Sequence, residues 1–257
     1  MIRLRANNFD LKDIELVLFD KDGTIFDIHK YWSFVITRRA EYFSNLAEPL
    51  HRRRLFDELN MVMGLMDNNL ISNSGPVGIK SRRDIIELVC STLQKTISEV
   101  TIEDVEIGFS KIDSMANDSF DSTLKTLPGV KKVMEELRNE KCLVSLATTD
   151  VESRSIQTLK YADLYQYFDC MVCSDHVKNS KPSRDIVDKT MKELNCQNRN
   201  GVALIGDSMV DLEMAKNSGI HFIGVGTGLN SNEFITQSDN YVEFLTELEI
   251  LPHKTNL

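Results

Sequence analysis

The sequence Leu-Val-Leu-Phe-Asp-Lys-Asp-Gly-Thr, residues 16–24, decides the fold of this chain. Its four apolar residues are typical of a strand that is buried on both faces of a parallel sheet. Asp20 and Asp22 follow where the strand ends, and Gly23 allows the backbone to turn sharply. Because ligands bind beyond the carboxyl ends of the strands in open α/β sheets, the two carboxylates are expected to line a binding crevice.

Asp20 and Asp22 are close enough in sequence for their charges to repel each other. Such a pair needs a cation between the carboxylates or a shared proton. An ordinary turn would also explain Asp and Gly at these positions, because both residue types favour turns. The pattern along the rest of the chain favours a functional role.

Composition describes a globular protein of 257 residues with 42% hydrophobic and 27% charged residues. The net charge of −9 disfavours nonspecific nucleic-acid binding, which requires a basic surface. No apolar stretch is long enough to span a membrane, so no membrane association is expected. Residues 1–8 lack the apolar core of a signal peptide, and a cytoplasmic location is therefore expected.

Strand and helix patterns alternate from residue 127 onward, as a doubly wound parallel sheet requires. The first strand is predicted at residues 15–19. Later strands are predicted at 142–147, 170–173, 202–205 and 220–225, and helices at 130–139, 153–162, 183–194, 211–217 and 241–248. We predict an α/β fold, with a Rossmann-like doubly wound parallel sheet core formed by residues 1–27 and 126–257.

Residues 28–125 carry helical patterns with no comparable strand signal. Helices are predicted at 31–46, 49–66, 81–94 and 103–120, with Ser81 and Asp84 as an N-terminal cap of the third. An all-helical insertion directly after the first acidic loop is best explained as a separate cap domain.

Three further loops at or near strand ends carry the remaining candidate residues. Thr148 and Thr149 follow one strand, Lys181 precedes Pro182, and Asp207 and Asp211 follow another strand. A parallel sheet brings such loops to one edge. Taken singly, each has an ordinary explanation: a threonine that ends a strand, a solvated lysine, or an aspartate that complements a helix dipole.

In this order and at these strand ends, the residues resemble the four motifs of the haloacid dehalogenase superfamily. The resemblance extends over the whole chain. It implies a Rossmann-like core, and it implies that residues 28–125 are a C1-type helical cap of the phosphoglycolate phosphatase-like subfamily.

The resemblance implies roles for the acidic residues. Asp20 would be the nucleophile that forms an aspartyl-phosphate. Asp22 would protonate the leaving group and then activate water. Mg²⁺ would be held by Asp20, by the backbone carbonyl of Asp22 and by Asp207.

It also implies roles for the remaining loop residues. Thr148, Thr149 and Lys181 would bind the phosphoryl oxygens. Asp211 would lie in a second layer, where it orients a metal-bound water or Lys181.

Asp22 discriminates between the reactions of the superfamily. Dehalogenases lack an acid at this position, and the transport ATPases carry threonine there. The sequence therefore favours hydrolysis of a small-molecule phosphate monoester, either phosphoglycolate-like or a sugar phosphate. A sugar phosphomutase is the alternative enzyme, and a non-catalytic protein that binds a phosphorylated metabolite is a third possibility.

Substrate selection is expected to lie in the cap. Lys80 and Arg83, beside the loop at 73–78, are candidate contacts for an anionic group, and His29 lies near the predicted hinge. Solvated charges beside a helix start would explain the two basic residues equally well.

Overall fold

The computed structural model describes residues 1–229 and 232–252. The chain divides into two compact units, one formed by Met1–Asp27 with Thr126–Leu257 and the other by Ile28–Lys125. The second unit is thus an insertion that begins six residues after Asp22.

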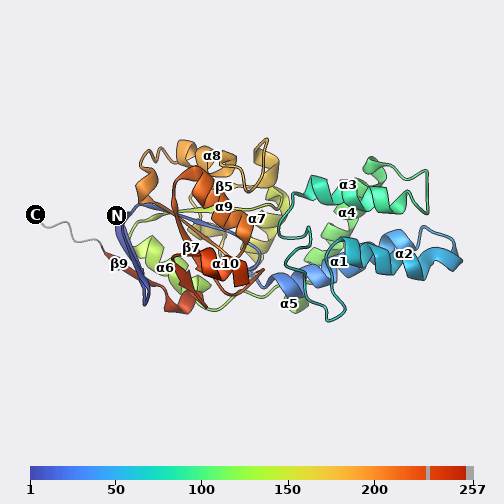
Figure 1. Cartoon of the computed structure of the whole chain (residues 1–257), viewed down its shortest axis with the longest axis horizontal. Coiled ribbons are helices and arrows are strands. Elements are labelled where there is room, and N and C mark those ends of the chain that lie inside the picture. Colours follow the sequence, from blue (N-terminus) through green and yellow to red (C-terminus); the bar gives the residue numbers. More distant parts are fainter. Residues whose placement is uncertain (230–231, 253–257) are drawn as a thin grey trace, which may run out of the picture. The chain divides into compact units, whose positions relative to one another are not determined.

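The first unit is built on a six-stranded sheet with the order β5-β4-β3-β6-β7-β8 (Figure 1). Every pairing in this sheet is parallel. The predicted α/β class with a doubly wound parallel sheet is therefore confirmed. The strands are β3 (Leu16–Phe19), β4 (Leu143–Ala147), β5 (Cys170–Val172), β6 (Val202–Gly206), β7 (His221–Val225) and β8 (Tyr241–Val242).

Strand β3 lies in the middle of the sheet, and its four side chains are fully buried. A continuous apolar run is stable only where both faces of the strand are covered. In the parallel register Phe19 lies opposite Leu146 of β4 and Ile205 of β6. The three strands therefore end nearly level, and the polar residues that follow them come together at one edge.

Helices of the first unit surround this sheet (Figure 1). Helix α9 begins with a capping box between Ser208 and Asp211 and ends at Gly219, whose φ of 63° is left-handed. A left-handed glycine at this position is a common way for a helix to end. The helices are α6 (Val130–Asn139), α7 (Glu152–Tyr161), α8 (Asp185–Glu193), α9 (Met209–Ser218) and α10 (Asn232–Gln237).

A second, antiparallel sheet in this unit has the order β2-β1-β9, and the sequence analysis does not predict it. Its strands are β1 (Ile2–Ala6), β2 (Phe9–Ile14) and β9 (Glu249–Pro252). The strand predicted at 15–19 is therefore the third in the chain. Cross-strand ion pairs of Arg3 with Asp10 and of Arg5 with Glu249 join the three strands.

The helix predicted at 241–248 is wrong. This segment forms the short strand β8 and a 3₁₀ turn, Leu245–Glu247. Tyr241 and Val242 pair with β7, and Leu245 and Leu248 are buried. Tertiary pairing overrides a short apolar pattern whose period does not distinguish a helix from a strand.

The second unit is helical, as predicted. Ser81 and Asp84 form a reciprocal capping box at the start of its third helix, which confirms the predicted cap. Inside the unit, the guanidinium of Arg39 is buried over the ring of Phe109 and pairs with Asp113. The helices are α1 (Ile28–Ser44), α2 (Pro49–Val62), α3 (Arg82–Leu93), α4 (Ile102–Asn117) and the short α5 (Phe120–Thr123).

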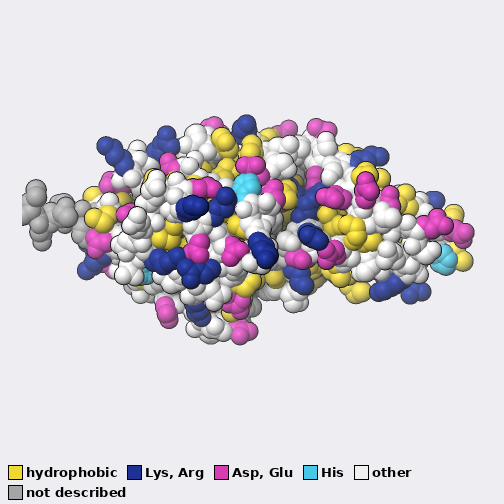
Figure 2. Space-filling model, turned by 90° about the horizontal axis from the view of Figure 1, so that it is seen from above, with side chains coloured by type: hydrophobic (Ala, Val, Ile, Leu, Met, Phe, Trp, Pro, Cys, Tyr) yellow, Lys and Arg dark blue, Asp and Glu magenta, His cyan; other side chains and the backbone are white. Residues whose placement is uncertain are grey.

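On the face seen in Figure 2, Lys and Arg side chains are interspersed with Asp and Glu side chains. Within the described part of the chain, no helix has the length and apolar character that crossing a bilayer requires.

Candidate active site

The carboxyl edge of the parallel sheet gathers the acidic residues of the sequence motifs. Asp20 follows β3, whereas Asp207 and Asp211 follow β6. All three are at least nine-tenths buried. Single carboxylate oxygens of the three residues lie within 4.8 Å of one another. A cluster of this kind forms because parallel strands of equal register deliver their loops to the same place.

Lys181 supplies the positive charge of this cluster from the loop before α8. Its Nζ lies 2.6 Å from Oδ1 of Asp20 and 2.5 Å from Oδ1 of Asp211. Burial would lower the pKa of Lys181, but the two carboxylates raise it above its ordinary value. Lys181 is thus a protonated cation in the cluster, and the structure brings it together with Asp20 and Asp211.

The charged form of Asp20 is disfavoured despite the contact with Lys181. Burial disfavours its charged form and raises the pKa of Asp20 to about 7, with Lys181 acting in the opposite direction. The pKa of Asp207 is also raised well above its ordinary value, by burial first and then by the charges of Asp20 and Asp211. Three carboxylates around one ammonium group leave an excess of negative charge, which a divalent cation would neutralise.

The carboxylate of Asp207 is held by backbone and hydroxyl donors. The N–H of Leu229 donates to Oδ2 at 2.5 Å, and the hydroxyl of Thr24 donates to Oδ1 at 3.3 Å. Gly23 and Gly228 pass so close to this carboxylate that a Cβ at either position would overlap it. Glycine is therefore required at both positions, and the loop after β7 is a part of the site that sequence reasoning missed.

Asp211 serves two partners at once. Its Oδ1 accepts from Lys181, while its Oδ2 accepts from the backbone N–H and the hydroxyl of Ser208. Asp211 therefore caps the start of α9 and contacts Lys181 with its other oxygen.

Asp22 lies outside this carboxylate cluster. Both of its side-chain oxygens face Lys21, at 3.0 Å and 2.8 Å from Nζ. The same ammonium lies 3.1 Å from Asp150, which in turn pairs with Arg154. Sequence reasoning missed this group, although Asp150 directly follows the two threonines and Arg154 lies four residues farther on.

Thr148 and Thr149 are both buried at the end of β4. The hydroxyl oxygen of Thr148 accepts the backbone N–H of Asp150 at 3.1 Å. Because the oxygen is the acceptor in this contact, the Thr148 O–H still carries a hydrogen that it can donate to a ligand oxygen.

The three cap candidates belong to the second unit and differ in setting. Nδ1 of His29 accepts the backbone N–H of Ile71 at 3.1 Å. The Arg83 side chain is 87% exposed and pairs with Glu87 along α3. Lys80 is exposed in the loop before α3. Arg83 thus has the solvated setting that the sequence analysis named as its alternative.

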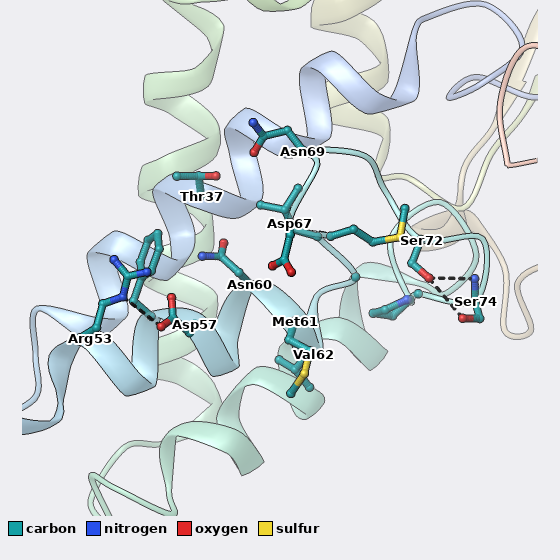
Figure 3. A pocket seen from close by; sticks show the side chains of 16 residues that line it. Thr37, Arg53, Asp57, Asn60, Met61, Val62, Asp67, Asn69, Ser72 and Ser74 are labelled. Carbon is teal, nitrogen blue, oxygen red and sulfur yellow. Dashed lines mark hydrogen bonds and ion pairs between the residues drawn. The ribbon is translucent and has the colours of Figure 1, made fainter.

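Within the second unit, α2 and the loop that follows it line a pocket of about 1040 Å³ (Figure 3). The polar side chains of Asn60, Asn69 and Thr37 alternate there with apolar ones such as Val62. The side chains of the three cap candidates do not line this pocket. Arg53 also lines the pocket, as do the carboxylates of Asp57 and Asp67, and Arg53 pairs with Asp57 along α2. One cation that is already paired suits a phosphate poorly, because a phosphate needs several cationic or N–H donors.

The fold and the site define an α/β enzyme with a lysine-paired carboxylate cluster at the carboxyl edge of its sheet. The family model for haloacid dehalogenase-like hydrolases matches residues 17–225, and the chain belongs to this family.

Two curated relatives are similar over most of their length. A phosphorylated carbohydrates phosphatase of Thermotoga maritima is 28% identical over 88% of this chain and 91% of that protein. The pyrophosphatase PpaX of Halalkalibacterium halodurans is 23% identical over 71% of this chain and 90% of that protein.

Solved structures share the fold. A predicted phosphoglycolate phosphatase from Haemophilus somnus has a TM-score of 0.69 at 16% identity, covering 91% of this chain and 96% of that one. A β-phosphoglucomutase from Clostridium difficile has a TM-score of 0.67 at 18% identity, covering 92% and 93%. At these identities the likeness concerns the fold alone.

Proposed function

We propose that this enzyme is a Mg²⁺-dependent phosphatase that hydrolyses a small-molecule phosphate monoester through an aspartyl-phosphate on Asp20. The observation that carries the proposal is the buried contact of 2.6 Å between Lys181 and Asp20, set within a cluster of three carboxylates. The family and its phosphatase relatives support the class of phosphoric monoester hydrolase.

Two displacements make up the proposed reaction. A carboxylate oxygen of Asp20 attacks phosphorus, the bond to the ester oxygen breaks, and Asp22 gives its proton to the departing alkoxide. Asp22 then takes a proton from water, whose oxygen attacks the same phosphorus and releases Asp20 and inorganic phosphate. Lys181, the Thr148 hydroxyl and Thr149 hold the phosphoryl oxygens while the charge on these oxygens is redistributed.

The residues present fit a divalent cation. Their oxygen donors are those that Mg²⁺ prefers, and three carboxylates carry more negative charge than the one ammonium group of Lys181 neutralises. Asp20, the backbone carbonyl of Asp22 and Asp207 would hold the ion, with Asp211 adjacent. When bound, the ion screens the repulsion between the Asp20 carboxylate and the phosphate dianion.

A sugar phosphate is the proposed substrate class. The support is the relative named as a phosphatase of phosphorylated carbohydrates, which matches 88% of this chain. We propose that the helical unit selects among such small metabolites, with His29 and Lys80 as the contacts to examine and the solvated Arg83 as the weakest of the three.

A sugar phosphomutase is the second candidate, because it would use the same nucleophile and the same acid, Asp20 and Asp22. A mutase would return the phosphoryl group to a second hydroxyl of the sugar, whereas a phosphatase gives it to water. Release of inorganic phosphate therefore distinguishes the two.

The test measures phosphate release from a panel of sugar phosphates, phosphoglycolate and pyrophosphate, with Mg²⁺ and with EDTA. Wild type and Asp20→Asn are compared. Release that needs both Mg²⁺ and Asp20 supports the proposal. Isomerisation of a sugar phosphate without release supports the mutase, and release that persists in Asp20→Asn contradicts the nucleophile assignment.

A further inference from the structure

Lys21, between the two acidic residues of the first loop, is fully buried. Its ammonium group lies 3.0 Å from Oδ1 and 2.8 Å from Oδ2 of Asp22. A lysine that contacts both oxygens of one carboxylate restricts the rotation of that carboxylate about its Cβ–Cγ bond. Asp22 is itself only 7% exposed, so water does not replace this contact easily.

Lys21 is held in turn by a residue from another strand end. Oδ2 of Asp150 lies 3.1 Å from the ammonium of Lys21. Nε of Arg154 donates to both oxygens of Asp150 at 2.9 Å, and the backbone N–H of Val151 donates at 2.8 Å. Burial would raise the pKa of Asp150, but Arg154 and Lys21 lower it below its ordinary value. Asp150 is therefore a carboxylate anion between two cations.

The four side chains form one buried chain of alternating charge: Arg154, Asp150, Lys21, Asp22. Each residue is at most 7% exposed. Removing one member of such a chain leaves a buried charge without its partner, which is strongly unfavourable. Arg154 lies on α7, Asp150 after β4, and Lys21 with Asp22 after β3, so the chain ties the first loop to the neighbouring strand end.

We propose that Lys21 is a positioning residue of the reaction. Supported by Asp150 and Arg154, it fixes the Asp22 side chain in the orientation from which the protonated carboxyl group passes its proton to the leaving group and is left as a carboxylate. The inference rests on the proposed function of Asp22 and adds the three residues that hold it. A purely structural ion-pair network would affect folding without changing how the rate depends on the leaving group.

The experiment compares Lys21→Met with wild type on two substrates. An alkyl phosphate needs a proton on its leaving group, whereas p-nitrophenyl phosphate expels a weakly basic phenolate. A general acid is worth about 10²–10⁴-fold in rate. We expect kcat on the alkyl ester to fall about 100-fold, kcat on the nitrophenyl ester to fall about threefold, and both KM values to stay nearly unchanged.

Three further variants sharpen the test. Asp150→Asn keeps the shape of the side chain and should give the same substrate pattern more weakly. Adding Asp150→Asn to Lys21→Met should change kcat little further. The effects of two residues that act through one another are not additive. Lys132→Met, the same change on the exposed face of α6, is the matched control and should leave both substrates unaffected.

Equal losses on the two esters, or no loss in either variant, would overturn the inference. A wild-type enzyme that releases no phosphate would instead reject the proposed function. A crystal structure of Lys21→Met tests the inference without any measurement of activity. Asp150→Asn replaces it if the first variant does not fold. A displaced Asp22 carboxylate supports the inference, and an unmoved one contradicts it.

Discussion

The ammonium group of Lys181 lies 2.6 Å from the carboxylate of Asp20, although 161 positions separate the two residues in the sequence. The contact is buried, and Lys181 reaches Asp211 in the same way at 2.5 Å. A single cation therefore supports two of the three carboxylates of the cluster. The stability and the chemistry of the site depend on this arrangement.

Replacing Lys181 by methionine should destabilise the protein and abolish phosphatase activity. Asp20 and Asp211 would lose their buried cation, and breaking a buried ion pair from one side costs about 3–5 kcal/mol. Urea unfolding at pH 8 without metal measures the loss. Lys192→Met, on the exposed side of α8, is the control and should stay within about 0.5 kcal/mol of wild type. Equal effects of the two changes would contradict the role given to Lys181.

The stability of the metal-free protein should depend on pH through Asp20. Its pKa is raised from 3.8 to about 7 in the folded state, so the folded state binds this proton more tightly than the unfolded state does. Between these values, the contribution of Asp20 to the free energy of unfolding falls as pH rises. Thermal unfolding in EDTA from pH 4 to 8 should show a decline that is weaker in Asp20→Asn.

Addition of Mg²⁺ should reverse this decline. Because the ion binds the ionised carboxylates, the increase in Tm should be larger at pH 8 than at pH 5. An equal increase at both pH values would mean that the ion binds elsewhere, as would an increase that survives in Asp20→Asn.

Asp22→Asn should lower kcat by an amount that depends on the leaving group of the substrate. The amide cannot donate a carboxylic proton, so alkyl phosphates should lose about 10²–10⁴-fold in kcat. For the nitrophenyl ester, the rate of the first displacement should fall less than it does for alkyl phosphates. Nitrophenolate release in a single turnover measures this step alone. Equal losses on both esters in that step would argue against Asp22 as the general acid.

Gly228→Ala should impair activity by displacing Asp207. A Cβ at Gly228 would overlap the Asp207 carboxylate and would lie 2.6 Å from Cα of Gly23. A misplacement of about 1 Å can cost about 100-fold in rate. Steady-state kinetics and Mg²⁺ titration measure the loss.

Gly219→Ala is the matched control for that variant. Gly219 has a φ of 63° but open space around its Cα, so alanine there should cost about 1–2 kcal/mol of stability and leave kcat unchanged. Similar kinetics of the two alanine variants would mean that the loop after β7 does not hold Asp207 in place.

The sequence was sufficient to predict the fold class, because strong local patterns agree with one another. The apolar run before Asp20 predicts a central strand, and the regular alternation after residue 127 predicts the remaining parallel strands. The strands within residues 1–14 and 241–252 are harder to predict from the sequence. Their strands are short and pair over long sequence distances, as Arg5 does with Glu249, and no local pattern reports such pairing.

Some contacts of the candidate site can likewise be predicted from the sequence, and others cannot. Asp20, Asp22, Lys181 and Asp207 occur in motifs that follow or neighbour strand ends, and parallel topology alone brings these ends together. The contact of Lys21 with Asp22 and Asp150 cannot be predicted in this way. A lysine in a loop is usually solvated. Lys21 is buried because the loop that carries it packs among neighbouring strand ends.

By itself, the sequence determined that a parallel sheet presents acidic loops at one edge, because strand period, turn residues and motif order are local properties. Only the tertiary structure decided which charges pair there: Lys181 with Asp20 and Asp211, and Lys21 with Asp22 and Asp150. The physical reason is that the choice of partner for a charge depends on burial and on distances of about 3 Å. Both are set when segments far apart in the chain pack together.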